Sequence, residues 1–323
     1  MSDDELEAPG WDAILGALQG IYGGREPDAH YGTLIPYALG GPDPLRGISV
    51  YRTDAFGRPQ WHYVTFGFTD LYEKEGDDPA VSGYGFELSL RLARGDEAEP
   101  PQWPLGVLQS LGRYVFQTGN RFGRGDHASF PFGDGERAFD GAGFGTDREL
   151  PAAVDSPNGR FLFLALVGLY EDELDALRSW NGDKALAVID SLDPGLVTTL
   201  GRASWASNPR FAAAVAEGVA QDGSSMGHLP FPELRVSGRT LTMPAFRRDL
   251  FLQALRNRLP HGRRLDVWAD EDRLVRFEPG PAWAVQEEDS LLVVAVPPDM
   301  DALAAAVDGA APIDGLSFVL EPD

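Results

Sequence analysis

The first part of the chain carries the apolar pattern of a sheet. Residues Tyr84–Leu92 have an apolar side chain at every second position, which is typical of a strand with one buried face. Residues Arg160–Gly168 are almost all apolar, as expected of a central strand that is buried on both faces. Shorter runs rich in aromatic and β-branched residues predict four further strands: Thr33–Ala38, Ile48–Arg52, Trp61–Phe68 and Pro194–Leu200.

Apolar residues at three- and four-residue steps predict helices between and after these strands. Pro104 stands where a first helical residue is favoured, and the helix that it begins carries Tyr114 toward its end. Residues 132–159 are rich in glycine and weakly patterned, so a long surface excursion is expected there. The other helices are predicted at residues 9–23, Glu171–Trp180, Asp183–Leu192, Pro209–Ala220, Ala245–Leu259 and Met300–Val307.

A polar stretch that contains glycine, Gln221–Gly227, precedes a renewed strand pattern. Strands are then predicted at Leu234–Val236, Thr240–Met243, Arg264–Trp268, Leu274–Glu278, Leu291–Val296 and Leu316–Leu320. We therefore predict an N-terminal domain over residues 1–227 and a smaller domain over residues 228–323. Because strands and helices do not alternate regularly, both should be α+β lobes, each a mixed, mainly antiparallel sheet with packed helices.

Composition narrows the class of protein. The chain has 323 residues, of which 43% are hydrophobic and 24% charged, a balance typical of globular domains. No apolar run reaches the length of a membrane span, and the acidic N-terminus does not resemble a signal peptide, so a cytoplasmic protein is expected. The chain has no cysteine, which excludes disulfides and thiolate zinc sites.

The formal net charge of −23 bears on the partners of the protein. Such a chain is repelled by nucleic acid and by anionic membranes, whereas a basic partner is steered toward it. Solubility alone also accounts for this charge, so both interpretations stay open.

The loop that follows the helix beginning at Pro104 is the first candidate functional segment. Gly119, Asn120, Gly123 and Gly125 end the helix and form a loop that presents Asp126 and other ionisable residues. A loop of this kind beside a packed helix suits recognition or catalysis.

That loop has two chemical interpretations, of which the first is a catalytic or metal-binding group. His62, Asp126 and His127 could form an acid–base or metal group, as in a hydrolase, if the fold brought them together. No HExxH or other tight ligand spacing is present, and no GxSxG or phosphate-binding glycine motif occurs. We therefore favour His62 as a structural residue and Asp126 as a residue that braces its loop. No catalytic residue, metal or cofactor is expected.

The second interpretation is a binding surface. Carboxylates beside tyrosines suit a cationic or amide-rich peptide, because tyrosine supplies apolar area together with a hydrogen bond. Core tyrosines beside a solvated acidic face are the alternative, which composition alone favours. The candidate partner-binding residues are Asp70, Tyr72, Tyr114, Asp126 and Asp147.

Several segments resemble the suppressor of fused family, in family order and over most of the chain. They are YVFQTGNRFGRGDH (Tyr114–His127), LGGPDPL (Leu39–Leu45), WHYVTFGFTDLY (Trp61–Tyr72), SGYGFELSLRL (Ser82–Leu92), WNG (Trp180–Gly182) and LRNRLPHGR (Leu255–Arg263). The resemblance is strong over residues 9–227 and thinner beyond them.

The resemblance implies a non-enzymatic binding protein with two lobes that hold an extended peptide between them. The family's contact tyrosine falls on Tyr114, its contact aspartate on Asp126, and a further acidic contact near Asp147. Bacterial members are thought to act as immunity proteins that bind and block a toxin, and the scarcity of lysine suggests a GC-rich bacterial genome. The expected protein is thus a monomer that sequesters a basic partner, such as a toxin domain, in an interlobe cleft.

Overall fold

The computed structural model describes residues 7–135, 138–269, 273–309, 313 and 315–322. They form two compact units. The first unit comprises Met1–Leu174 and Gly182–Phe211, and the second comprises Asp175–Asn181 and Ala212–Asp323. The predicted domain ranges 1–227 and 228–323 differ from this division and stay a prediction.

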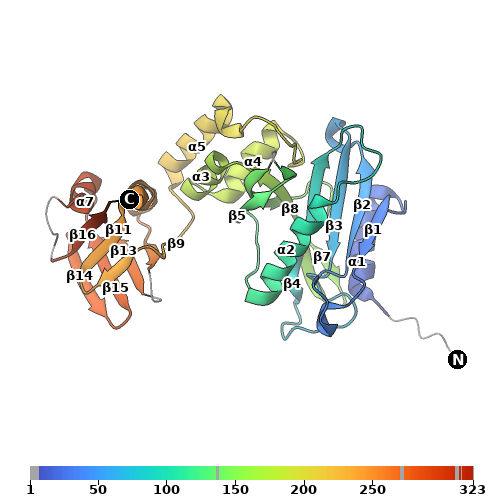
Figure 1. Ribbon diagram of the computed structural model, residues 1–323, viewed down its shortest axis with the longest axis horizontal. Helices are drawn as coiled ribbons and strands as arrows, with labels where there is room; N and C mark the ends of the chain where they lie inside the picture. The colour runs from blue at the N-terminus through green and yellow to red at the C-terminus, as the bar shows by residue number, and fades with distance from the viewer. Residues whose placement is uncertain (1–6, 136–137, 270–272, 310–312, 314, 323) are drawn as a thin grey trace. The chain divides into compact units, whose positions relative to one another are not determined.

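The first unit is built on one eight-stranded sheet (Figure 1). Its strand order is β1-β2-β3-β4-β8-β6-β5, with β7 beside β8, and only the pairing of β4 with β8 is parallel. The strands are β1 (Ala29–Gly32), β2 (Gly47–Thr53), β3 (Gln60–Phe66), β4 (Val81–Ala93), β5 (His127–Phe132), β6 (Phe139–Thr146), β7 (Val154–Ser156) and β8 (Gly159–Leu169).

Two helices cover the opposite faces of this sheet. Helix α1 (Pro9–Tyr22) packs Ile14 and Leu18 against Phe161 and Phe163 of β8. Helix α2 (Trp103–Thr118) packs against the other face, where the even-numbered leucines of β8 lie. Side chains alternate between the faces of a strand, so a central strand buried on both faces must be apolar throughout. The prediction for Arg160–Gly168 is therefore confirmed.

Strand β6 contradicts the prediction of a surface excursion over residues 132–159. One face of β6 consists of Gly141, Gly143 and Gly145. A Cβ atom at Gly143 would lie 2.9 Å from Leu186 of α4 (Gly182–Leu192), and one at Gly145 would lie 2.4 Å from Leu196. The glycines admit these leucines to the sheet, and they also remove the apolar alternation by which a strand is recognised.

Two other local predictions are wrong. Residues Thr33–Ala38 do not form a strand, because β1 ends at Gly32 and a 3₁₀ turn, η1, occupies Tyr37–Leu39. Pro194–Leu200 contributes only an isolated bridge between Thr198 and Leu92.

The second unit contains two mixed sheets. One has the order β10-β11-β16 and the other β14-β15-β13-β12-β9. The strands are β9 (His228–Pro230), β10 (Arg235–Ser237), β11 (Thr240–Pro244), β12 (Leu265–Trp268), β13 (Leu274–Pro279), β14 (Ala284–Glu288), β15 (Leu291–Val296) and β16 (Ser317–Glu321). The helices beside them are α6 (Arg248–Arg256) and α7 (Met300–Val307), whereas α3 (Glu171–Ser179) and α5 (Pro209–Asp222) each belong in part to both units.

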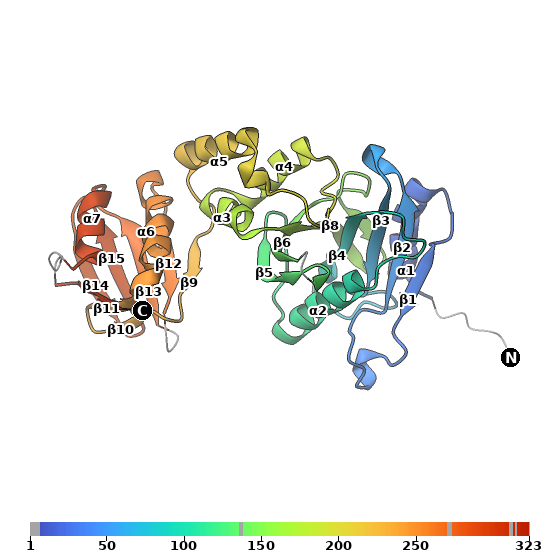
Figure 2. The same ribbon diagram turned by 45° about the horizontal axis from the view of Figure 1, so that its top comes forward.

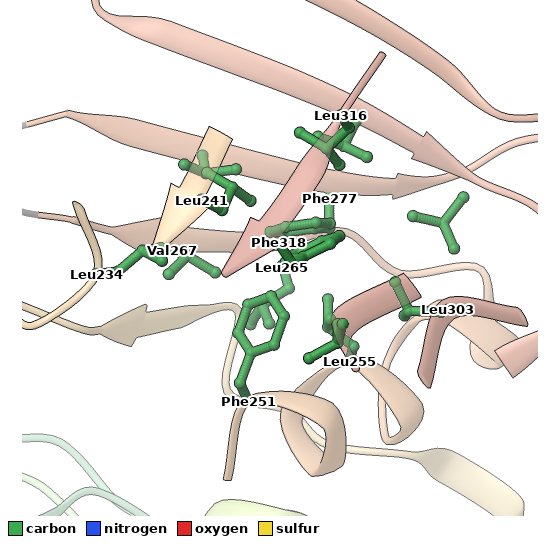
Figure 3. Packing of buried hydrophobic residues seen from close by; sticks show 14 of the residues in the cluster. Leu234, Leu241, Phe251, Leu255, Leu265, Val267, Phe277, Leu303, Leu316 and Phe318 are labelled. Carbon is green, nitrogen blue, oxygen red and sulfur yellow. The ribbon is translucent and has the colours of Figure 1, made fainter. Parts of the chain in front are cut away.

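One apolar core holds the second unit together (Figure 3). Phe251 of α6 meets Phe277 of β13 edge-on at 5.4 Å, and Phe318 of β16 lies 6.2 Å from Phe251. Leu303 of α7 completes the same core. The expected α+β class, with helices packed on mixed sheets, is confirmed. Over the residues that the structure describes, no helix combines the length and the apolar character that crossing a membrane requires.

Candidate functional site

The candidate site begins where α2 ends. Gly119 adopts a φ of 72°, a left-handed conformation that favours glycine, and its N–H donates to the Val115 carbonyl (2.8 Å). The chain then forms a loop before β5 begins at His127. The positive φ of Gly119 thus stops the helix and turns the chain into this loop.

The loop is braced from both sides. Asp126 accepts a hydrogen bond from the Gly123 N–H (2.7 Å), and its carbonyl accepts one from the Phe144 N–H of β6 (2.9 Å). Gly125 lies against the start of α4, where a Cβ atom at Gly182 would come within 1.8 Å of the Gly125 carbonyl oxygen. Only glycine fits at Gly182, so the loop is held closely against α4.

Tyr114 lies in the last turn and a half of α2, beside this loop, as a supported but exposed aromatic residue. Its side chain is 42% exposed, and its ring stacks on Phe122 at 5.6 Å. Phe122 in turn stacks on the buried Phe144 at 4.1 Å. The Tyr114 hydroxyl accepts a hydrogen bond from the side-chain amide of Asn120 (2.9 Å). The ring is therefore ordered before any partner arrives.

The Tyr114 ring stacks on Phe122, and the Asp126 carboxylate accepts the N–H of Gly123, which follows Phe122 in the chain. These three residues are called here the Tyr114 surface. Asp126 is exposed, and Phe122 is partly buried between Tyr114 and Phe144. The sequence reasoning left Phe122 out, although it stands in the middle of the segment that carries the family resemblance.

Asp70 and Tyr72 differ in their environments. Asp70 is 7% exposed and binds Lys74 Nζ at 2.9 Å. Tyr72 is 37% exposed, with the Arg46 guanidinium 5.9 Å from its ring. Only Tyr72 of this pair offers substantial surface, and a contact role for either stays a prediction.

Asp147 lies in a buried polar cluster on the α1 side of the sheet. It accepts hydrogen bonds from Arg91 Nε (3.1 Å) and Nη2 (3.0 Å), and its carboxylate lies 3.6 Å from His62 Nε2. Arg91 also pairs with Glu149 at 2.9 Å, and the Tyr22 hydroxyl lies 2.6 Å from His62 Nδ1. With 4% exposure, Asp147 serves the fold here, and its predicted partner contact stays untested.

This environment shifts the pKa values of the cluster. Burial and the charge of Arg91 lower the pKa of His62 to about 3, although Asp147 opposes the shift, so the imidazole is neutral at pH 7. Burial alone would raise the pKa of Asp147, but the charges of His62 and Arg91, with the hydrogen bonds, lower it overall. Burial raises the pKa of the Tyr22 hydroxyl, which therefore stays protonated.

A second buried carboxylate, which the sequence reasoning missed, supports the segment that leads to Asp70. Glu87 is fully buried and accepts hydrogen bonds from the Gly67 N–H (2.9 Å), the Thr69 N–H (3.0 Å) and the hydroxyls of Thr65 and Thr69. Burial raises the pKa of Glu87 to about 7, and the hydrogen bonds limit that rise. Its partners are hydroxyls and backbone N–H groups rather than basic side chains, so the sequence around Glu87 does not reveal its role.

The proposed group of His62, Asp126 and His127 does not converge. His62 is fully buried on β3, whereas His127 begins β5 and Asp126 is exposed beside it. Strands β4, β8 and β6 lie between β3 and β5, which separates them by about 19 Å at the usual strand spacing. The described residues contain no group of three or more His, Asp or Glu side chains that could hold a metal ion.

Comparison with known proteins gives a consistent result. A family model described as Suppressor of fused protein (SUFU) matches residues 41–203. The human and mouse proteins described as Suppressor of fused homolog are each 35% identical over 238 residues, which cover 67% of this chain and 48% of the relative. The chain thus spans about half the length of these curated relatives.

Two solved structures are also similar. The crystal structure of Drosophila Suppressor of Fused matches this chain with a TM-score of 0.79 at 22% identity. The match covers 96% of this chain and 92% of the Drosophila chain. A chain of the Sufu-Fu complex crystal structure matches with a TM-score of 0.59 at 30% identity. That match covers 65% of this chain and 98% of the chain in the complex. The relatives with a named organism are animal proteins, and they do not support the prediction of a bacterial member.

Proposed function

The chain belongs to the suppressor of fused family, and from that premise we propose that it is a non-enzymatic module that binds a protein partner through the Tyr114 surface. One observation carries the proposal: Tyr114 is 42% exposed, yet its ring is fixed by Phe122 and its hydroxyl by Asn120. An ordered aromatic side chain beside a carboxylate is a typical anchor of a protein interface.

The supporting contacts lower the cost of binding. A flexible side chain loses rotamer freedom when a partner orders it, at about 0.5–1.5 kcal/mol for each such residue. Tyr114 and the loop of Asp126 have already lost most of that freedom through their contacts with Phe122, Phe144 and α4. More of the interaction energy then remains as affinity.

The partner is proposed to be basic, since the net charge of −23 steers cationic surfaces toward the chain and Asp126 supplies a local carboxylate. A relative, Sufu, forms a complex with Fu, which supports a protein partner as a class. Toxin neutralisation by an immunity protein is the more specific hypothesis, and it rests on the family resemblance alone.

Other attributes follow as expectations. We expect a cytoplasmic monomer that binds neither nucleic acid nor membranes and needs no cofactor. An interlobe cleft as the seat of the partner stays a prediction. A hydrolase built on His62, Asp126 and His127 is disfavoured, because three strands stand between the two histidines.

Site-specific photo-crosslinking tests the proposal. The full chain is made with p-benzoylphenylalanine at position 114, or at the matched exposed position of Leu15 on α1, and is irradiated inside its native host. A discrete protein crosslinked from position 114 and not from position 15 is expected, because a partner must approach the Tyr114 ring within contact distance. Equal products from both positions, or none from position 114, would contradict the proposal.

A further inference from the structure

An arginine-rich connection joins α6 to β12 in the second unit. Figure 2 shows α6 and β12 next to β9, the strand that pairs with β12. The connection contains Arg258, Arg263 and Arg264, and it contacts residues 223–227, which lead from α5 to β9. All of these residues belong to the second unit. Such a concentration of positive charge is unusual in this chain, because acidic residues outnumber basic ones, 50 to 27.

Two guanidinium groups of this connection meet at one backbone oxygen. Arg258 Nη1 donates to the Ser224 carbonyl at 2.7 Å, and Arg263 Nη1 donates to the same oxygen at 3.1 Å. The two Nη1 atoms are therefore no more than about 6 Å apart. Arg258 Nε also donates to the carbonyl of Arg264 (2.6 Å). We call Arg258 and Arg263 the arginine pair.

The arginine pair lacks a counter-charge. Within the part of the chain that the structure describes, neither of its members forms an ion pair with a carboxylate. Arg258 is nevertheless only 8% exposed. Burial lowers its pKa, and the charges of Arg263 and Arg264 add to this shift, although Asp266 opposes it. Because buried charges in proteins are normally paired, an anion would complete this arrangement.

A carboxylate beside the arginine pair is already taken by another arginine. The Asp266 N–H donates to the Gly227 carbonyl (3.0 Å), which places this residue next to residues 223–227. Its carboxylate accepts hydrogen bonds from Arg276 Nε (2.7 Å) and Nη2 (3.0 Å), a bidentate pair that uses both oxygens. It lies 3.8 Å from Arg264 Nη2, beyond hydrogen-bond distance. One guanidinium group thus holds one carboxylate here, and the arginine pair stays free for another anion.

Three nitrogens of the arginine pair remain as donors. Arg258 Nη2, Arg263 Nε and Arg263 Nη2 form no hydrogen bond within the residues that the structure describes. Arg263 is exposed, and a Cβ atom at Gly227 would lie 3.4 Å from Arg258 Nη2. A long side chain at Gly227 would cover that nitrogen, so the glycine keeps it accessible. Free N–H groups on a planar guanidinium are strong ligands for carboxylate or phosphate oxygens.

We propose that the arginine pair is a binding site for a phosphate monoester. Such a group carries a charge of about −1.5 to −2 at pH 7 and three acceptor oxygens, which match two guanidinium groups and their free nitrogens. A carboxylate needs only one guanidinium group, as Asp266 shows. The site belongs to the second unit and the Tyr114 surface to the first, so this proposal goes beyond the function proposed above. The phosphate comes from a small metabolite or from a phosphorylated protein segment, and the test distinguishes the two.

Calorimetric titration of the full chain tests the phosphate site. The probes are glycerol phosphate and capped tripeptides with phosphoserine, aspartate or serine between two glycines. The phosphoserine peptide should bind about tenfold or more tightly than the aspartate peptide, and the serine peptide should not bind, because charge-assisted hydrogen bonds to a dianion carry the interaction. Equal affinity for glycerol phosphate and the phosphoserine peptide would indicate a small metabolite, whereas a preference for the peptide would indicate a protein segment.

Two variants remove the site in different ways. Arg263→Ser takes away an exposed guanidinium group and should lower the affinity for the phosphoserine peptide about tenfold or more. Gly227→Leu keeps both charges but covers Arg258 Nη2, and it should also weaken binding. Arg258 itself is left in place, because it also holds the Ser224 and Arg264 carbonyls. Thermal unfolding without ligand shows that each variant is folded.

Two further variants serve as matched controls. Arg273→Ser removes a positive charge at the other end of the β12–β13 pair, where Trp268 faces Leu274, and should not change the affinity. Arg263→Lys keeps the charge but loses the planar guanidinium, so its affinity should fall between those of the wild type and Arg263→Ser.

Several results would overturn the phosphate site. They are no binding of either phosphate compound, equal affinity for the phosphoserine and aspartate peptides, and unchanged affinity in both Arg263→Ser and Gly227→Leu. A loss in Arg273→Ser as large as that in Arg263→Ser would attribute the binding to overall charge rather than to a site. Tighter binding of oligothymidylate than of the phosphoserine peptide, lost in Arg263→Ser, would assign the arginine pair to the phosphodiesters of nucleic acid instead.

Discussion

Tyr114→Ala combined with Asp126→Ala should nearly abolish partner binding and leave the fold intact. An aromatic anchor and a carboxylate at the centre of an interface each contribute on the order of 2 kcal/mol, or roughly 30-fold in affinity for each residue. The cost to stability should be small, because Tyr114 is 42% exposed and Asp126 is a surface residue. Affinity is measured by calorimetry with the purified partner that photo-crosslinking identifies, and stability is measured by thermal unfolding.

The control for this variant uses acids away from the site. Asp77 and Asp78 are exposed in the acidic loop after Tyr72, and their replacement by alanine should alter mainly the association rate and its salt dependence. Unchanged affinity for the Tyr114 and Asp126 variant, together with a sharply lowered melting temperature, would identify Tyr114 as a structural residue.

Asp147→Ala should have the largest effect on stability. The substitution leaves Arg91 charged and 2% exposed without its main carboxylate partner, and breaking a buried pair from one side typically costs about 3–5 kcal/mol. Urea unfolding at pH 7 should show this loss in the unfolding midpoint. The partner affinity of the fraction that stays folded should change little, since the Asp147 carboxylate faces Arg91 and His62.

Two comparisons test this interpretation of Asp147. Replacing both partners, Arg91→Met with Asp147→Leu, should restore much of the lost stability, because the uncompensated buried charge is then gone. The pKa of His62 in the folded protein, about 3, lies below the ordinary histidine value of 6.5. The folded state therefore binds fewer protons than the unfolded state, and the wild type should lose stability as pH falls from about 6.5 toward 3. If the Asp147→Ala variant were as stable as the wild type but no longer bound the partner, Asp147 would be a contact residue after all.

Much of the fold could be predicted because apolar periodicity records which faces are buried. The even-numbered positions of β4 and the continuous apolar run of β8 follow directly from one-sided and two-sided burial. Strand β6 could not be predicted in this way, since Gly141, Gly143 and Gly145 leave room for side chains from elsewhere in the chain. Strand β14 was missed as well, because its residues after Val285 are polar and exposed.

The candidate site could be predicted only in part. The helix-to-loop position of Tyr114 and Asp126 follows from local glycine and helix patterns, which sequence records well. The burial of Asp147 depends on Arg91, 56 residues away in the sequence. The exposure of Leu34, Ile35 and Leu39 was hidden for a similar reason: the composition of this segment suits a strand, and only the early end of β1 leaves it outside the sheet.

The central claim is that a protein partner binds at the Tyr114 surface. Amide hydrogen exchange of the full chain, with and without the purified partner that photo-crosslinking identifies, tests this claim most directly. Binding at the Tyr114 surface should slow exchange over residues 114–127, because a partner there covers both the end of α2 and the loop that it leads into. The same protection should be absent in the Tyr114 and Asp126 variant at equal concentration. Protection by the partner confined to other segments, with unchanged exchange over residues 114–127, would contradict the account.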